Sequence, residues 1–144
     1  EKFEAMIDLA EANSRMKDFY DIWRSAQLMR LDGAILSKAI MATSKQRATK
    51  FTDPLPFVLS DEFRMDAGKQ RLWKAFIQKN HLANNIDFAT LVEQLGILLK
   101  PVYRAAANQA SLKNHRSPEQ WQWLAMLCWN TIQPTKANTH ATEY

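Results

Sequence analysis

The sequence predicts an all-α fold, a bundle of about five to six helices. Apolar side chains recur in several separate segments at the 3.6-residue spacing of an amphipathic helix. The 144 residues include only three glycines and five prolines, too few for the many sharp turns of a β-sandwich or barrel. A hydrophobic fraction of 47% suits a folded globule. We therefore expect a single helical domain over residues 1–132, followed by a polar tail over residues 133–144.

Two helices are predicted at the start of the chain. The first runs from about Glu1 to Ala12, where Asn13 and Ser14 interrupt it. Ser14 is a suitable N-cap for the second helix, which extends to about Met29. The inward face of the first helix is expected to comprise Phe3, Met6, Ile7 and Ala10. That of the second is expected to comprise Met16, Phe19, Tyr20, Trp23 and Ala26.

A short third helix and a loop are predicted next. Asp32-Gly33 forms a turn, and the third helix covers residues 34–43. The loop covers residues 45–59, where Pro54 and Pro56 fix an extended path. The inward residues of this helix are expected to be Ile35, Leu36, Ala39 and Ile40.

Three further helices are predicted in the second half. Asp66 caps a helix over residues 67–79, and Asp87 caps the next, which Pro101 kinks or ends. Ser117-Pro118 has the composition of a helix start and predicts a last helix. The inward residues expected for the helix over residues 67–79 are Leu72, Trp73, Phe76 and Ile77. Those of the helix after Asp87 are Leu91, Leu95, Leu98 and Leu99. Those of the last helix are Trp121, Leu124, Ala125, Leu127 and Cys128.

Composition excludes several classes of protein. The formal net charge of +4 and the pI near 9.3 favour contact with phosphates only mildly. A single cysteine, Cys128, cannot form an internal disulfide. No apolar run reaches the roughly 20 residues that span a bilayer, and no signal peptide is visible, so we expect a cytoplasmic protein without membrane contact. The chain opens without methionine and within a helix, which indicates a piece of a longer protein.

Familiar catalytic and metal motifs are absent from the sequence. The histidines His81, His115 and His140 lack partners at zinc-like spacing and are expected in loops or the tail, so no metal site is predicted. Most of the five tryptophans lie at inward helical positions and are expected in the core, but Trp123 lies off the apolar stripe and could sit at an interface. The basic run Lys45–Lys50 is expected in a loop, as a solvated surface or a contact for phosphates.

The polar side of the second helix is the strongest candidate site. Lys17, Asp21 and Arg24 share one stripe, and Asp18 lies beside Asp21. Carboxylates three residues apart on a helix repel each other unless cations relieve them. The pattern therefore suggests chemistry without requiring it, and the spacing alone favours a solvated i,i+4 ion pair between Lys17 and Asp21.

The order of several short segments resembles a known family. These segments are Glu1–Met6, Arg15–Ile22, Asp32-Gly33-Ala34 and Pro54-Leu55-Pro56, then Phe63, Asp66, Gln70, Trp73, Ala75-Phe76 and Lys79. Together they resemble the C-terminal helical part of the AbiEii/AbiGii-type nucleotidyltransferase toxins of bacterial toxin–antitoxin and abortive-infection systems. The resemblance covers residues 1–101.

The resemblance implies transfer of a nucleotide from a nucleoside triphosphate (NTP) to an acceptor such as RNA, with Mg²⁺ and NTP bound by the complete enzyme. It assigns Lys2 to the triphosphate, and Lys17, Asp18 and Asp21 to a catalytic motif in which the acid is a general base or orients a lysine. The family's Asp-x-Asp metal acids have no counterpart here. The resemblance therefore implies an inactive C-terminal lobe, whose partners are an N-terminal catalytic lobe, an antitoxin and acceptor RNA.

Two other functions remain open from the sequence. The chain could be a non-catalytic helical module that binds a protein or RNA through Trp123 and the run Lys45–Lys50. It could also be a helical bundle with a purely structural role, in which case the polar residues of the second helix would tolerate alanine.

Overall fold

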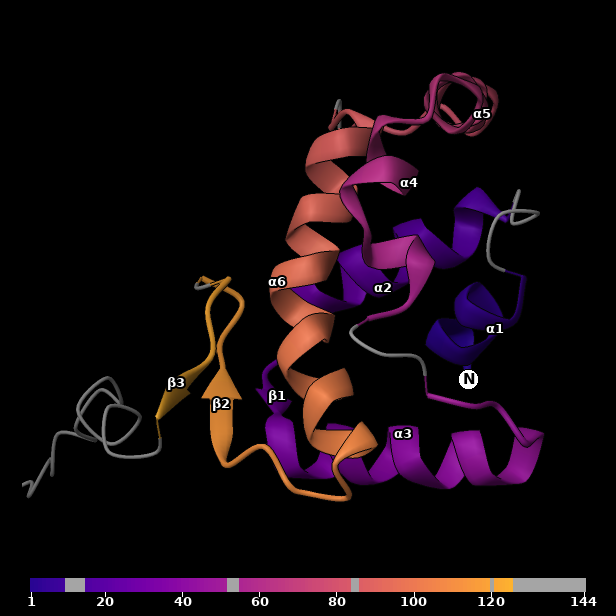
Figure 1. Cartoon of the computed structure of the whole chain (residues 1–144). Helices are drawn as coiled ribbons and strands as arrows, with labels where there is room; N and C mark the ends of the chain where they lie inside the picture. Colours follow the sequence, from indigo (N-terminus) through magenta and orange to yellow (C-terminus); the bar gives the residue numbers. More distant parts are fainter. Residues whose placement is uncertain (10–14, 52–54, 84–85, 120, 126–144) are drawn as a thin grey trace, which may run out of the picture.

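The computed structural model describes residues 1–9, 15–51, 55–83, 86–119 and 121–125. Over these residues the fold is the predicted helical bundle, arranged around the long helix α6 (Figure 1). None of the helices in this described part has the length and apolar character needed to cross a membrane. The helices are α1 (Lys2–Leu9), α2 (Met16–Leu28), α3 (Gly33–Arg47), α4 (Asp61–Met65), α5 (Ala67–Lys79) and α6 (Phe88–Ala107), with the 3-10 helix η2 (Phe57–Leu59).

Helix α6 forms the centre of the core. It contacts α2, α3, α4, α5 and η2, and Figure 1 shows α3 crossing near its C-terminal end. The predicted cap is confirmed, because the Asp87 carboxylate accepts hydrogen bonds from the backbone N–H and the hydroxyl of Thr90 at 2.9 and 2.7 Å. Those bonds hold the pKa of Asp87 below its usual value. The buried residues of α6 are Phe88, Leu91, Val92, Leu95, Gly96, Leu98, Leu99, Val102, Tyr103 and Ala106.

Pro101 lies inside α6 and does not end it. Proline has no N–H, so the carbonyl of Ile97 loses the donor that a helix normally supplies four residues later. The next carbonyl, that of Leu98, accepts a hydrogen bond of 2.9 Å from the indole N–H of Trp123. A residue from the end of the chain therefore supports the backbone of the central helix close to its proline.

The first two helices follow the predicted pattern. Residues Phe3 and Met6 of α1 are buried and Ile7 is partly buried; the predicted Ala10 and Ser14 lie outside the described residues. Helix α2 begins after Arg15, whose side chain makes no capping hydrogen bond. The predicted inward face of α2 is confirmed: Met16, Phe19, Trp23 and Ala26 are buried and Tyr20 is partly buried.

Helix α3 differs from the prediction in length and orientation. It continues to Arg47, so the run Lys45–Lys50 begins on a helix rather than in a loop. Ile35 and Ala39 are exposed instead of inward, and the buried positions are Gly33, Ser37, Ile40 and Ser44. Small and hydroxyl side chains form this inner face because their polar groups have partners: the Ser37 hydroxyl donates to the Gly33 carbonyl, and the Ser44 hydroxyl donates to Glu4.

Helix α5 has the predicted bounds and the predicted cap, since the Asp66 carboxylate accepts from the Lys69 N–H at 2.7 Å. Trp73 is buried, and Phe76 and Ile77 are partly buried as expected. Leu72 was expected inward but is exposed. Residues 57–59, expected in the loop, form η2. Residues 61–65, for which no element was predicted, form α4, and Ser60 caps it by accepting from the Phe63 N–H.

The predicted helix at Ser117-Pro118 is wrong. The structure has instead a small antiparallel sheet of order β1-β2-β3, formed by Leu31–Asp32, Asn114–Arg116 and Leu124–Ala125. Leu31 lies opposite Arg116, and His115 lies opposite Leu124. Pro118 and Glu119 lie in a turn, where the Glu119 carboxylate accepts a hydrogen bond from Ser117. The residues that are typical of a helix start therefore form a turn here. Leu127, Cys128 and the tail 133–144 lie outside the described residues.

Two close contacts hold the sheet against the helices. A Cβ atom at Gly33 would lie 2.6 Å from the carbonyl oxygen of Leu112 and 2.9 Å from that of Asn114, so the close backbone approach there requires glycine. Arg116 is fully buried; its Nη1 donates to the Ala26 carbonyl at 2.6 Å, and its guanidinium lies 4.4 Å from the ring centroid of Trp121. Burial lowers the pKa of Arg116.

The two isoleucines of α3 provide a direct test of its orientation. Ile40 is 6% exposed and Ile35 is 70% exposed. We expect Ile40→Ala to lower the free energy of unfolding by about 2–4 kcal/mol, because it removes buried methyl groups and leaves a cavity. Ile35→Ala, the matched control, should change it by no more than about 0.5 kcal/mol. Urea unfolding of both variants measures these changes in the free energy of unfolding. Equal losses of stability in the two variants would contradict the orientation of α3.

Candidate functional site between α1 and α2

The four residues singled out in the sequence lie together where α1 meets α2. The ammonium of Lys2 is 2.8 Å from Oδ2 of Asp21 and 3.4 Å from Oδ1 of Asp18. The ammonium of Lys17 is 2.6 Å from the same Oδ2 of Asp21. Lys2 therefore relieves the repulsion between two carboxylates that are three residues apart on one helix. We call these four residues the lysine–aspartate cluster.

A fifth charged residue extends the cluster. Nε of Arg15 lies 3.7 Å from Oδ2 of Asp18, so each carboxylate faces two cations. The sequence interpretation gave Arg15 no role, although its i,i+3 spacing from Asp18 is the signal that could have found it. Arg24, which shares the polar stripe, is not in the cluster; its guanidinium donates to Gln27 at 2.9 Å.

Packing next to the cluster fixes both helices. In α1, the residue after Lys2 is Phe3, whose ring packs edge-on against Tyr103 with centroids 6.1 Å apart. Glu4 is fully buried and accepts a hydrogen bond of 2.6 Å from the Ser44 hydroxyl, which ties α1 to α3. In α2, the residue after Asp18 is Phe19, which is fully buried. The charged groups therefore extend from two helices whose neighbouring residues are anchored in the core.

The aspartate side chains of the cluster are less exposed to solvent than the lysine side chains. The side chains of Asp18 and Asp21 are 13% and 25% exposed, whereas those of Lys2 and Lys17 are 49% and 72% exposed. Burial raises the pKa of Asp21, but hydrogen bonds from Lys17 and Lys2 and their positive charges outweigh burial and hold that pKa below its usual value. The hydrogen bond to Asp21 is the main reason that the pKa of Lys2 is raised. An incoming anion would meet the ammonium groups first.

The cluster does not fit a magnesium ion. Mg²⁺ requires free carboxylate oxygens in octahedral geometry. Two ammonium groups already contact the same oxygen of Asp21, and a third cation faces Asp18. Nowhere in the part of the chain that the structure describes do three or more His, Cys, Asp or Glu residues gather in a way that could hold a metal.

Of the four tryptophans that the structure describes, two are core residues as expected, and Trp129 lies outside the described residues. Trp23 and Trp73 are buried, and their indole N–H groups donate to the side chain of Gln94 at 2.7 Å and to the carbonyl of Ile86 at 2.8 Å. Trp123, for which the sequence left a place at an interface open, is partly buried and contacts α6 through Leu98.

The other polar candidates take no part in the cluster. His115 lies in strand β2, not in a loop, and its Nδ1 is 3.5 Å from Oδ2 of Asp32. His81 lies in the turn after α5, and His140 is outside the described residues. Of the basic run, Arg47 lies 3.9 Å from Asp8.

Replacing Asp21 should alter the pH dependence of stability. Because its folded-state pKa is lowered, Asp21 stabilises the fold above its ordinary pKa of 3.8, and this contribution is lost as the pH falls through the folded-state value. We expect Asp21→Asn to lower the free energy of unfolding by no more than about 1 kcal/mol near neutral pH, since the group is partly solvated. The difference from the wild type should be smaller near pH 2 than near neutral pH, because Asp21 loses its charge as the pH falls. Urea unfolding of the variant and the wild type at both pH values measures this difference in stability. A difference in the free energy of unfolding that grows in acid would contradict the ion-pair geometry.

Comparisons with known proteins identify the family. No curated protein and no solved structure matches the chain. The family model described as nucleotidyl transferase AbiEii toxin, Type IV TA system, matches residues 1–94. This match covers more than half of the 144 residues and includes the whole lysine–aspartate cluster. The chain therefore belongs to the AbiEii nucleotidyl transferase toxin family.

Proposed function

We propose that this chain is the helical lobe of a toxin-type nucleotidyltransferase, which transfers a nucleotide from an NTP to an acceptor such as RNA. The observation that carries the proposal is the lysine–aspartate cluster: in a member of this family, two exposed lysines converge on one carboxylate at the contact of two helices. Lysine is a compact point charge that suits phosphate groups.

In this proposal Lys2 and Lys17 bind the phosphates of the NTP. An ammonium group has three N–H donors. Lys17 directs one of them to Asp21, and Lys2 directs two, to Asp18 and Asp21. Each lysine therefore keeps at least one donor for a phosphate oxygen while the carboxylates hold it in place. Positive charge fixed beforehand at the phosphates stabilises the negative charge that shifts during transfer.

The two aspartates are proposed as positioning residues rather than general bases. A general base works best with a pKa near the pH of the reaction. The pKa of Asp21 is lowered, and one of its oxygens already contacts two ammonium groups. Of the two roles that the sequence left open for the acid, orientation of the lysines fits this geometry better.

The metal-binding acids of the reaction are proposed to come from an N-terminal catalytic lobe. Mg²⁺ supplies charge neutralisation to phosphoryl chemistry, and the cluster described above offers it no suitable ligands. We accordingly expect the chain to be inactive alone and to act in the cytoplasm with its catalytic lobe, acceptor RNA and a cognate antitoxin, the last because the family is a toxin of a Type IV system.

The alternative of a non-catalytic binding module has less support. It relied on an exposed Trp123 and on a loop containing Lys45–Lys50. Trp123 is partly buried and hydrogen-bonded to α6, and the basic run begins on α3.

Substitutions in the cluster of the full-length enzyme test the proposal. We expect Lys2→Ala and Asp21→Asn each to lower the rate of transfer by at least about 100-fold, because each removes or misplaces charge at the phosphates. The matched control is Lys38→Ala, an exposed lysine of α3, which should leave the rate unchanged. Incorporation of a labelled nucleotide into RNA measures the rate.

Circular dichroism and thermal unfolding of the same variants distinguish a functional loss from a structural one. The proposal requires that both variants stay folded. If either unfolds, or if Lys2→Ala retains full transfer activity, the cluster has a structural role.

A further inference from the structure

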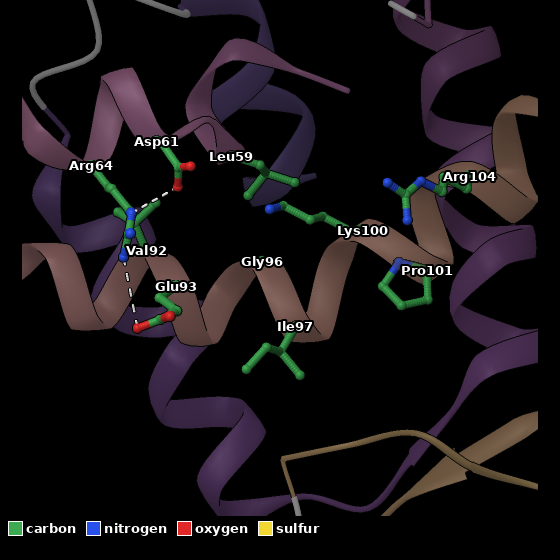
Figure 2. Close-up of a pocket in the computed structure, with 10 residues that line it drawn as sticks. All are labelled: Leu59, Asp61, Arg64, Val92, Glu93, Gly96, Ile97, Lys100, Pro101 and Arg104. Atoms are coloured by element: carbon green, nitrogen blue, oxygen red, sulfur yellow. Dashed lines mark ion pairs between the residues drawn. The ribbon is translucent and has the colours of Figure 1, made fainter. Parts of the chain in front are cut away.

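A groove along α6 forms a second charged feature, apart from the lysine–aspartate cluster. It has a volume of about 430 Å³ and lies between α6, α4 and η2 (Figure 2). Arg64 at one end is neutralised by two acids: its Nε is 2.9 Å from Asp61 and its Nη1 is 3.7 Å from Glu93. Two acids against one arginine leave this end with a net negative charge.

The other end of the groove carries excess positive charge. Lys100 and Arg104 line it, and neither side chain makes an ion pair or a side-chain hydrogen bond with any residue that the structure describes. They are four residues apart on α6, so their backbone positions differ by about 6 Å along the helix axis. Figure 2 shows both side chains on the side of α6 that faces Leu59 and Asp61. Like charges at this spacing disfavour the helix unless an anion bridges them.

Gly96 gives Lys100 its path across the groove. A Cβ atom at Gly96 would lie 3.1 Å from Cε and 3.5 Å from Nζ of Lys100, so the lysine side chain folds back over the glycine. Glycine in the interior of a helix is unfavourable compared with alanine. The central helix therefore has a glycine in its interior at the point where the side chain of Lys100 rests.

An apolar hollow continues the groove. It has a volume of about 510 Å³ and shares Leu59, Asp61 and Lys100 with the charged groove. Its other lining residues are Leu55, Pro56, Phe57 and Ser60. Phe57 is only partly buried. Cations beside apolar and aromatic surface are the combination that binds single-stranded nucleic acid, because phosphates contact the cations while bases lie on the apolar groups.

We propose that this groove binds a single strand of RNA, with phosphodiesters on Lys100 and Arg104 and a base against Leu55 and Phe57. The identification of that strand as the acceptor rests on the proposed function; the binding rests on the groove alone. A phosphodiester carries one negative charge, which suits two cations, whereas the acids Asp61 and Glu93 in the same groove disfavour a free triphosphate.

Fluorescence anisotropy with a labelled oligouridylate of about 12 nucleotides tests the binding in the 144-residue chain. We expect Lys100→Ala/Arg104→Ala to weaken binding at least tenfold and to reduce the salt slope of log K by about 1 to 1.5, as for two lost phosphate contacts. The charge-matched control Lys45→Ala/Lys50→Ala should weaken it less than threefold. Equal losses in both double variants, or no binding by the wild type at about 50 mM salt, would overturn the proposal.

A second variant and a competitor sharpen the test. Gly96→Ala keeps every charge and favours the helix, but displaces the Lys100 side chain; it should weaken RNA binding several-fold without lowering the melting temperature. Unlabelled ATP should compete far less well than unlabelled oligouridylate at equal phosphate concentration. Competition by ATP as strong as that by RNA would overturn the assignment to a strand.

The two proposals fail separately. If Lys100→Ala/Arg104→Ala retains RNA affinity while Lys2→Ala abolishes transfer in the full-length enzyme, the groove proposal is wrong and the proposed function stands. If the double variant loses RNA affinity while Lys2→Ala transfers normally, the groove is an RNA site and the proposed function is wrong.

Discussion

The burial of α6 is the constraint on which the rest of the structure depends. A helix that is apolar around most of its circumference must be covered on nearly every side. Helix α1 contributes to this cover through Phe3, which contacts Tyr103, and α2 through Trp23, which donates to Gln94. The hairpin formed by β2 and β3 contributes through Trp123. Each covering element is held in position by its own contact with α6. The charged residues that α1 and α2 carry, which form the lysine–aspartate cluster, are therefore held in position as well.

The lysine–aspartate cluster and the α6 groove illustrate two electrostatic states of a basic side chain. Lys2 and Lys17 face carboxylates, so their charge is balanced and their position is fixed before any ligand arrives. Lys100 and Arg104 make no ion pair with any residue in the described part of the chain, so their charge is not directly compensated. The first arrangement favours orientation of a bound phosphate, and the second favours its attraction.

Local features of the structure could be predicted from the sequence, and features that depend on distant partners could not. The bounds of α5, the inward face of α2 and the cap at Asp87 depend on neighbours within one or two helical turns. The inner face of α3 depends on Glu4, far away in the sequence, and the hairpin depends on pairing with β1.

The candidate site divides in the same way. The Lys17–Asp21 contact follows from i,i+4 spacing on one helix. The approach of Lys2 from another helix was implied only by the family resemblance, because no local pattern relates it to Asp21. Arg15 was missed although its spacing is local.

The pairing of β1 with β2 has a consequence for the synthesis of the chain. Strand β1 follows α2 directly, yet its partner strand leaves the ribosome only after the whole of α6. Until residues 114–125 emerge, the edge of β1, the backbone beside Gly33 and the Leu98 carbonyl lack the contacts they have in the fold. Closing such a long loop is entropically costly and slow. A nascent chain that stopped after the family-matched residues 1–94 would end inside its own central helix, so translation must pass well beyond them before this core can close.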